Sequence, residues 1–206
     1  MLLELDQAQL VLVDYQSRLM PHIHDSARVL AQARLLAQVA DLLHMPIHVT
    51  EQTPESLGAT VEALSPWARA PLHKSHFSAC EDGLIDLLKP STPSPARGNA
   101  RSLPKHLRKA VPAPAARDTV IIAGVEAHIC LLQTTLGLLE QELDVWVVTD
   151  ASGACATRQS DAAWDRLASA GAELVTAEMV VYECLRDSRD PAFAQVLSWV
   201  KAARQA

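Results

Sequence analysis

The sequence has 206 residues and contains no long hydrophobic run, no CxxC cysteine pair and no excess of positive charge. No apolar stretch approaches the roughly 18 residues that a membrane-spanning helix needs, so we expect no membrane as a partner. The N-terminal residues MLLELDQAQLVLVD lack the basic start and cleavage site of a signal peptide, which predicts a cytoplasmic protein. The formal net charge of −6 gives no reason to expect nucleic acid as a partner.

The cysteines and histidines do not form a recognisable metal or disulfide framework. The four cysteines, at positions 80, 130, 155 and 184, are widely spaced, which favours reduced thiols in a chain of this size. His73, His76 and His128 have no metal-ligand spacing. We therefore expect neither a bound metal nor another cofactor.

Short apolar runs alternate with segments of helical periodicity along the whole chain. The pattern predicts strands at 10–13, 47–50, before Lys74, and at 119–123, 145–149 and 173–176, with helices at about 26–43, 82–88, 129–141, 160–170, 177–185 and 191–203. Continuous apolar strands that alternate with helices are typical of a parallel sheet covered on both faces. The sequence predicts an α/β protein of three layers, with a six-stranded and mainly parallel sheet.

One segment, at about 89–117, breaks this alternation. It is rich in proline, serine and alanine, and from Pro90 to Arg117 it has six Lys or Arg residues and no acidic residue. It is interpreted as an exposed insertion or linker, or as a basic flap that draws in an anionic substrate. The remainder predicts a single domain over residues 1–206.

The stretch Gly124-Val-Glu-Ala-His-Ile-Cys130 follows the apolar run Thr119–Ala123 and precedes the predicted helix Ile129–Gln141. A cysteine at a helix start lies among unpaired N–H groups at the positive end of the helix dipole. This position favours the reactive thiolate form. The alternative interpretation is a buried cysteine that only fills space.

Two more polar residues follow predicted strands. Asp14 comes directly after 10–13, and Lys74 closes the third strand. Ligands of open parallel sheets bind beyond the carboxyl ends of the strands, so we expect Asp14, Lys74 and Cys130 at one edge. Taken singly, Asp14 is also compatible with a turn residue and Lys74 with a surface lysine.

Four motifs in order along the chain resemble the isochorismatase-like hydrolases, and most closely the isochorismatase domain-containing proteins. The resemblance covers roughly residues 8–90 and 118–203. The motifs are Leu12-Val-Asp-Tyr-Gln16, Val49-Thr-Glu-Gln52 with Leu57-Gly58, Lys74-Ser-His-Phe-Ser78, and Gly124-Val-Glu-Ala-His-Ile-Cys130 followed by Gln133-Thr-Thr135.

The resemblance implies a hydrolase with a catalytic triad of Asp14, Lys74 and Cys130. In this family the cysteine attacks an electrophilic carbon, usually of a small amide, to form a covalent thioester that water then hydrolyses. Asp14 would take the thiol proton and pass it to the leaving group, while Lys74 would hold the pair. The family also implies a homo-oligomer, a dimer or larger, that acts on a small-molecule substrate.

The resemblance also implies an oxyanion hole made by the backbone N–H groups of Glu126 and Cys130, with a cis peptide bond between Val125 and Glu126. The side chains expected to approach the substrate pocket are those of Tyr15, Gln52, Phe77 and His128. For Gln52 and Glu126 a purely structural role is the alternative, and for Tyr15 and Phe77 the alternative is core packing.

The sequence departs from the metal-binding members of the superfamily. Nicotinamidases hold a metal through an Asp-x-His pair and a later histidine after the second strand, but residues 50–58 contain no histidine. No metal is therefore expected here, and nicotinamidase activity is disfavoured. A catalytically silent protein that acts as a binding or scaffolding partner is the alternative to the hydrolase.

Overall fold

The computed structural model describes residues 2–89 and 117–206. The proline-rich basic insertion predicted at about 89–117 therefore lies almost wholly outside the described residues. The two described ranges contain all the predicted strands and all the residues proposed for the site.

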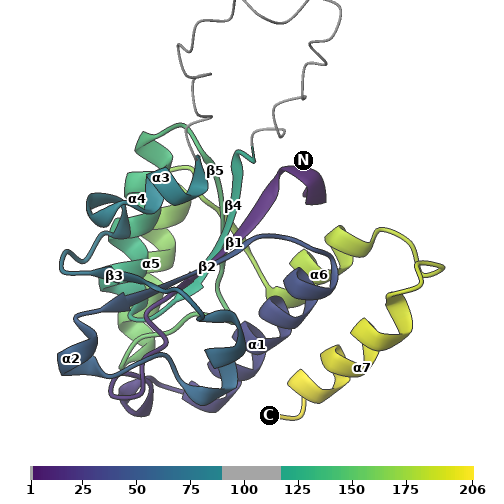
Figure 1. Cartoon of the computed structure of the whole chain (residues 1–206), viewed down its shortest axis with the longest axis horizontal. Helices are drawn as coiled ribbons and strands as arrows, with labels where there is room; N and C mark the ends of the chain where they lie inside the picture. Colours follow the sequence, from purple (N-terminus) through teal and green to yellow (C-terminus); the bar gives the residue numbers. More distant parts are fainter. Residues whose placement is uncertain (1, 90–116) are drawn as a thin grey trace, which may run out of the picture.

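The centre of the molecule is a six-stranded sheet in the order β3-β2-β1-β4-β5-β6 (Figure 1). Every neighbouring pair of strands is parallel, which confirms the predicted α/β class. The order changes direction between β1 and β4, the point at which open parallel sheets bind their ligands. The strands are β1 (Ala8–Val13), β2 (Ile47–Gln52), β3 (Leu72–Lys74), β4 (Thr119–Gly124), β5 (Asp144–Val148) and β6 (Glu173–Val175).

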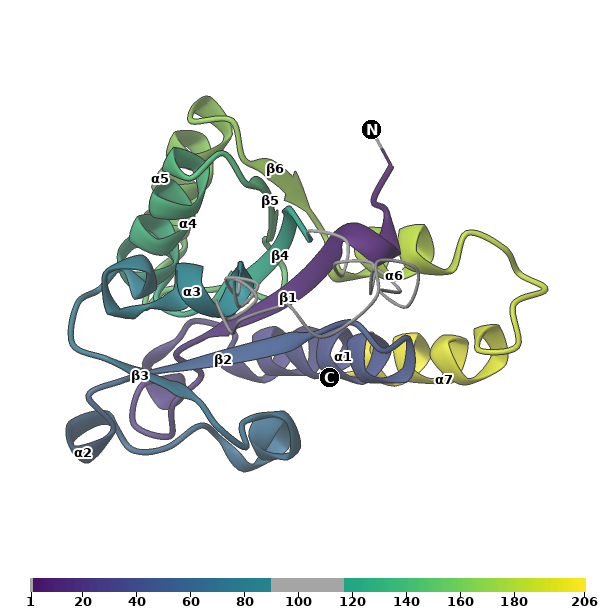
Figure 2. The same cartoon turned by 45° about the horizontal axis from the view of Figure 1, so that its top comes forward.

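Helices cover both faces of the sheet and give the predicted three layers (Figure 2). One layer contains α1 (Ser26–Leu42), α6 (Ala177–Leu185) and α7 (Phe193–Ala203); the other contains α3 (Leu84–Leu88), α4 (Leu132–Glu140) and α5 (Thr157–Ser169). The short helix α2 (Pro54–Leu57) lies beyond the end of β2. Each layer buries one face of the sheet, which removes the apolar strands from water on both sides.

Side chains of the central strands alternate between two hydrophobic cores. Leu10 and Leu12 of β1 pack in the core that contains the helix α1, whereas Val11 and Val13 pack in the core that contains Cys130 and the helix α4. This alternation follows from the two-residue period of a strand. It also explains why residues 10–13 of β1 form an uninterrupted apolar run, because both faces of the strand are buried.

Several predicted boundaries differ from the structure. The strand β2 continues to Gln52, so Thr50, Glu51 and Gln52 belong to a strand rather than to a loop. The helix predicted at 129–141 begins earlier, as a π-helical turn over Ala127–Leu131 that continues into α4. The structure also contains the short helix α2 and 3₁₀ helices at Leu5–Gln7, Met20–His22 and Glu62–Trp67, where the sequence pattern predicted no helix. These helices have one or two turns, too short to show a hydrophobic period.

Candidate active site

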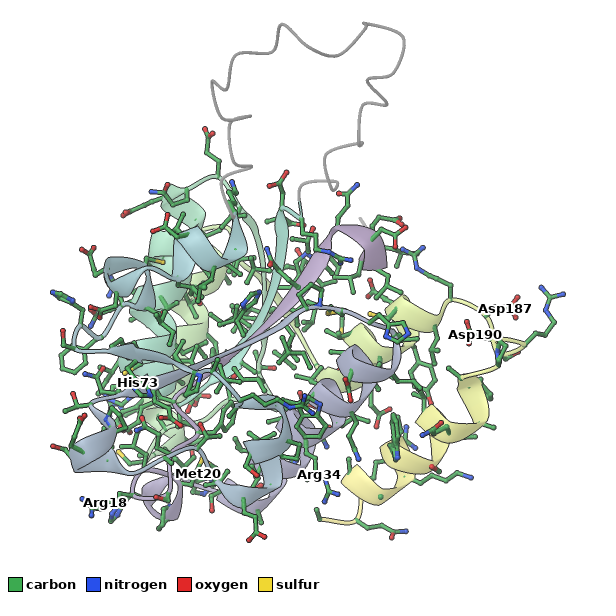
Figure 3. The ribbon with its side chains drawn as sticks, viewed as in Figure 1. Arg18, Met20, Arg34, His73, Asp187 and Asp190 are labelled. Carbon is green, nitrogen blue, oxygen red and sulfur yellow. The ribbon has the colours of Figure 1, made fainter. Side chains whose placement is uncertain are left out.

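The three residues of the predicted triad lie at the carboxyl ends of parallel strands. Asp14 follows β1, Lys74 is the last residue of β3, and Cys130 lies in the π-helical turn after β4. His73, which directly precedes Lys74 in β3, is labelled in Figure 3 and lies at the opposite end of the molecule from Asp187 and Asp190. The direction of the strands therefore brings polar residues from distant parts of the chain to one edge.

Asp14 and Lys74 form an ion pair inside the protein. The Nζ atom of Lys74 lies 2.7 Å from Oδ2 of Asp14, and neither side chain is exposed to solvent. The other carboxylate oxygen, Oδ1, accepts a 2.6 Å hydrogen bond from the Thr50 hydroxyl. The Lys74 ammonium therefore holds one oxygen of the carboxylate and the Thr50 hydroxyl holds the other.

The Lys74 ammonium has three further oxygen neighbours. It donates to Oε1 of Gln52 at 2.7 Å, to the carbonyl oxygen of Phe77 at 3.2 Å and to that of His76 at 3.3 Å. Gln52 is itself fixed, because its Nε2 donates to the carbonyl oxygen of Ser75 at 2.8 Å. Burying an ammonium is costly unless it is paired and hydrogen-bonded, and this set of oxygens meets that requirement.

Cys130 is buried next to this pair, with 6% of its surface exposed. The pKa of the Cys130 thiol is raised to about 12, first by burial and then by the Asp14 carboxylate, while Lys74 opposes the rise. The structure therefore does not support the prediction that the position at the helix start keeps Cys130 as a thiolate in the resting protein. Desolvation of the anion outweighs the ammonium of Lys74, so the resting sulfur carries its proton.

The chain before Cys130 makes a tight turn in which the Val125–Glu126 peptide bond is cis. Gly124 is required there, because a β-carbon on it would lie 2.5 Å from the Val13 carbonyl oxygen. The Ser152 hydroxyl accepts a 3.0 Å hydrogen bond from the Gly124 N–H and donates to the carbonyl oxygen of Val148.

The loop after β5 also holds the other side of this turn. The Ala127 N–H donates to the carbonyl oxygen of Gly153 at 2.7 Å. The Glu126 carboxylate accepts a 3.1 Å hydrogen bond from the Cys155 N–H. These contacts therefore support a purely structural role for the Glu126 side chain.

The four predicted pocket residues have different positions. The prediction that Tyr15 approaches the substrate pocket is wrong. Its side chain has no exposed surface and donates to the Ala151 carbonyl oxygen, so it packs in the core. Gln52 is buried and holds Lys74. Phe77 is 53% exposed, and only its carbonyl oxygen contacts Lys74. His128 is partly exposed, and its buried Nδ1 has no partner among residues 2–89 and 117–206.

Sequence reasoning missed Thr50, Ser152 and Asp82. Thr50 is paired in register with Val13, which places its hydroxyl beside Asp14. Ser152 supports the turn at Gly124, and Asp82 binds the loop after Lys74. Only Thr50 had a signal in the sequence, because it lies in the family motif Val49-Thr-Glu-Gln52.

The described residues contain no group of three or more His, Cys, Asp or Glu side chains placed to hold a metal ion. They also contain no helix long and apolar enough to cross a membrane. Cavities of about 470 Å³ and 200 Å³ lie elsewhere, the first beside His48 and Trp67 and the second beside Arg28 and Asp150.

Comparisons with known proteins agree with this architecture. Residues 99–179 match the model of the isochorismatase domain. Isochorismatase domain-containing protein 2A of Mus musculus is 30% identical over 192 residues, which cover 93% of this chain and 82% of that protein.

Two solved structures superpose over nearly the whole chain. MAR1 ribonuclease from Caenorhabditis elegans is 28% identical, with a TM-score of 0.80, and the match covers 98% of this chain and 93% of that one. YcaC from Pseudomonas aeruginosa, in a structure with hexane-2,5-diol and covalent acrylamide, is 26% identical with a TM-score of 0.79, and the match covers 99% and 94%.

Proposed function

The chain belongs to the isochorismatase family, and on that premise we propose that it is a cysteine hydrolase that cleaves a small amide or a related C–N or C–O bond. The observation that carries the proposal is the buried ion pair of Asp14 and Lys74, 2.7 Å apart, next to the buried thiol of Cys130. A thiol beside a carboxylate that can take its proton and an ammonium that can stabilise the thiolate is suited to nucleophilic catalysis.

In the first half-reaction the Cys130 thiol proton moves to Asp14 as the sulfur attacks the substrate carbonyl carbon. Asp14 suits this role because it is the carboxylate that acts on the Cys130 thiol. The tetrahedral intermediate then collapses, the C–N bond breaks, and the proton on Asp14 passes to the leaving amine. The product is a thioester between the acyl group and Cys130.

The high pKa of Cys130 is compatible with this sequence of steps. A thiol with a pKa of about 12 is protonated at neutral pH, so attack has to be coupled to the transfer of its proton. Lys74 lowers the cost of the thiolate that forms, because its ammonium acts on both the sulfur and the carboxylate. We therefore assign Lys74 to electrostatic stabilisation and Asp14 to proton transfer.

The oxyanion of the tetrahedral intermediate needs hydrogen-bond donors, and we assign the N–H groups of Glu126 and Cys130. The Glu126 N–H donates no hydrogen bond to another residue of the described ranges, which leaves it available. The turn that carries it is held by Ser152, Gly153 and the Cys155 N–H. One such donor typically contributes about 2.7–4 kcal/mol at the transition state.

In the second half-reaction water attacks the thioester carbonyl carbon. Asp14 accepts the water proton, the C–S bond breaks, and the proton returns to the Cys130 sulfur. The acid product leaves and the free enzyme is restored. The bond-making and proton-transfer steps use only the three side chains, the substrate and water, and the two backbone N–H groups stabilise the oxyanion.

The test is a panel of small primary and secondary amides, with acrylamide as a covalent probe. The wild type is expected to hydrolyse at least one amide, and acrylamide is expected to modify Cys130, as read by peptide mass spectrometry. Acrylamide is chosen because it combines an amide with an alkene that alkylates thiols, and because the Pseudomonas YcaC structure holds it covalently. A single-stranded RNA belongs in the panel, because the C. elegans neighbour is a ribonuclease.

Two results would contradict the proposal. One is amide hydrolysis that survives Cys130→Ala, and the other is a folded wild type that turns over no amide and forms no adduct at Cys130. The second result would support the silent scaffolding protein instead. Light scattering on the same preparation checks the further prediction of a homo-oligomer.

A further inference from the structure

Asp82 lies outside the proposed triad, at the end of the 3₁₀ helix Ala79–Asp82, but its carboxylate is bound to the loop that follows Lys74. Oδ2 accepts hydrogen bonds from the backbone N–H groups of Ser75, at 3.0 Å, and His76, at 2.9 Å. Oδ1 lies 3.1 Å from Nδ1 of the His76 ring. Both oxygens of one carboxylate are therefore engaged by two successive residues.

The same loop supplies oxygens to the site. The carbonyl groups of His76 and Phe77 accept from the Lys74 ammonium, and the carbonyl of Ser75 accepts from Nε2 of Gln52, whose Oε1 holds that ammonium. The N–H side of the loop is thus fixed by Asp82, and its carbonyl side faces Lys74 and Gln52.

From this arrangement we propose that Asp82 is a positioning residue for the hydrolase, acting on Lys74 through the backbone of residues 75–77. The inference rests on the proposed function, in which the Lys74 ammonium stabilises the charge on Cys130. Asp82 touches none of the three triad side chains, and its effect passes through hydrogen bonds on both sides of one short loop.

The distances make the Lys74 contacts sensitive to this loop. The two carbonyl contacts to Lys74, at 3.2 and 3.3 Å, are near the long end of the range for hydrogen bonds, so a shift of a few tenths of an ångström away would remove them. The ammonium has three protons and would then be free to turn toward Asp14 and Gln52 alone. Gly83, at φ 100°, allows the chain to turn directly after Asp82 and start α3.

The test is the rate at which acrylamide modifies each cysteine in Asp82→Ala, followed by peptide mass spectrometry. We expect the rate at Cys130 to fall about tenfold, since hydrogen bonds to a charged group are lost. Asp82→Asn keeps a side-chain oxygen for the two N–H groups and is expected to recover much of the rate. The matched control is Glu81→Ala, which removes the neighbouring exposed carboxylate and is expected to leave the rate unchanged.

Cys80 reports whether the substitution only loosens this part of the chain. It lies two residues before Asp82 and its thiol donates to the Thr134 carbonyl oxygen. Local unfolding would increase modification of Cys80 and Cys130 together, whereas loss of positioning lowers modification of Cys130 and leaves Cys80 within about twofold. The direction in which the modification rate of Cys130 changes therefore separates a positioning role from a structural one.

An unchanged Cys130 rate in folded Asp82→Ala would overturn the inference and leave the proposed function standing. Should that variant fail to fold, as judged by circular dichroism, His76→Ala removes only the contact of an exposed ring with Oδ1. It is expected to lower the Cys130 rate about two- to threefold, and no change there would equally overturn the inference. Failure of the proposed function is a different result, namely a wild type that is not modified at Cys130.

Discussion

Two buried cysteines on opposite faces of the sheet show how environment separates a reactive thiol from an inert one. Cys130 and Cys184 are 6% and 8% exposed, and burial is the first cause that raises the pKa of each to about 12. Cys184 lies on α6 among the aliphatic side chains that pack on α1. Cys130 lies beside the Asp14–Lys74 pair.

The charges near Cys184 are occupied elsewhere. Oε2 of Glu183 accepts from the Leu3 N–H, and the Arg186 guanidinium donates to the Leu3 carbonyl oxygen. Asp14, by contrast, is paired with Lys74 and acts directly on the Cys130 thiol. The comparison teaches that the pKa of the resting thiol does not distinguish the two cysteines, but a partner that can take its proton does.

The largest difference between the two cysteines is expected when each thiol is removed in turn. Cys130→Ala is expected to lower amide hydrolysis about a thousandfold or more, because the nucleophile is lost. Cys184→Ala is expected to leave the rate within about twofold and to cost about 1 kcal/mol of folding free energy, since it only removes packed atoms. Steady-state kinetics and urea unfolding check both, and a slow Cys184→Ala enzyme of normal stability would contradict the distinction.

A second set of variants separates the stability of the polar site from its chemistry. Asp14→Asn leaves the buried Lys74 ammonium unpaired, so we expect a loss of about 3–5 kcal/mol in the free energy of unfolding. It should also lower hydrolysis about 10²–10⁴-fold, because the proton acceptor is gone. The double variant Asp14→Asn/Lys74→Met removes both charges, and its stability is expected to recover while its activity does not. Recovery of activity would rule out the proposed role of Asp14.

The smallest expected effect is in alkaline solution. The folded thiols of Cys130 and Cys184 keep their protons to about pH 12, whereas the unfolded chain releases them near pH 9. Between these values the unfolded state binds fewer protons, so stability falls as pH rises, by about 1.4 kcal/mol per pH unit for each thiol. Urea unfolding at pH 9 to 11 measures this slope. Cys184→Ala is expected to reduce the slope by the contribution of one thiol. An unchanged slope would mean that burial does not hold the Cys184 proton.

The strands were the most predictable part of the molecule. Residues 10–13 of β1 and 120–123 of β4 are apolar at every position because both faces are buried, and these runs gave the strand positions to within two residues. The end of β2 was less predictable, because Thr50, Glu51 and Gln52 are polar and still continue the strand. They do so because their side chains bind Asp14, Thr60 and Lys74 rather than water.

The site was predictable in its residue types but not in its electrostatics. Asp14, Lys74 and Cys130 could be named from their places after strands and from the family motifs. Asp82 and Ser152 carried no such signal, since an aspartate in a loop and a serine after a strand are common in any α/β protein. The resting protonation of Cys130 was missed for a different reason: it depends on desolvation, which the order of residues does not show.

By itself, the sequence of this protein determined the alternation of strands and helices, because hydrophobic period and chain direction are local properties. It also determined which chemical groups follow the strands. Only the tertiary structure decided that Lys74 lies 2.7 Å from Asp14, that Gln52 supports Lys74, and that Tyr15 belongs to the core. Contacts and burial depend on residues that are far apart in the chain, and these become neighbours only when the sheet has formed.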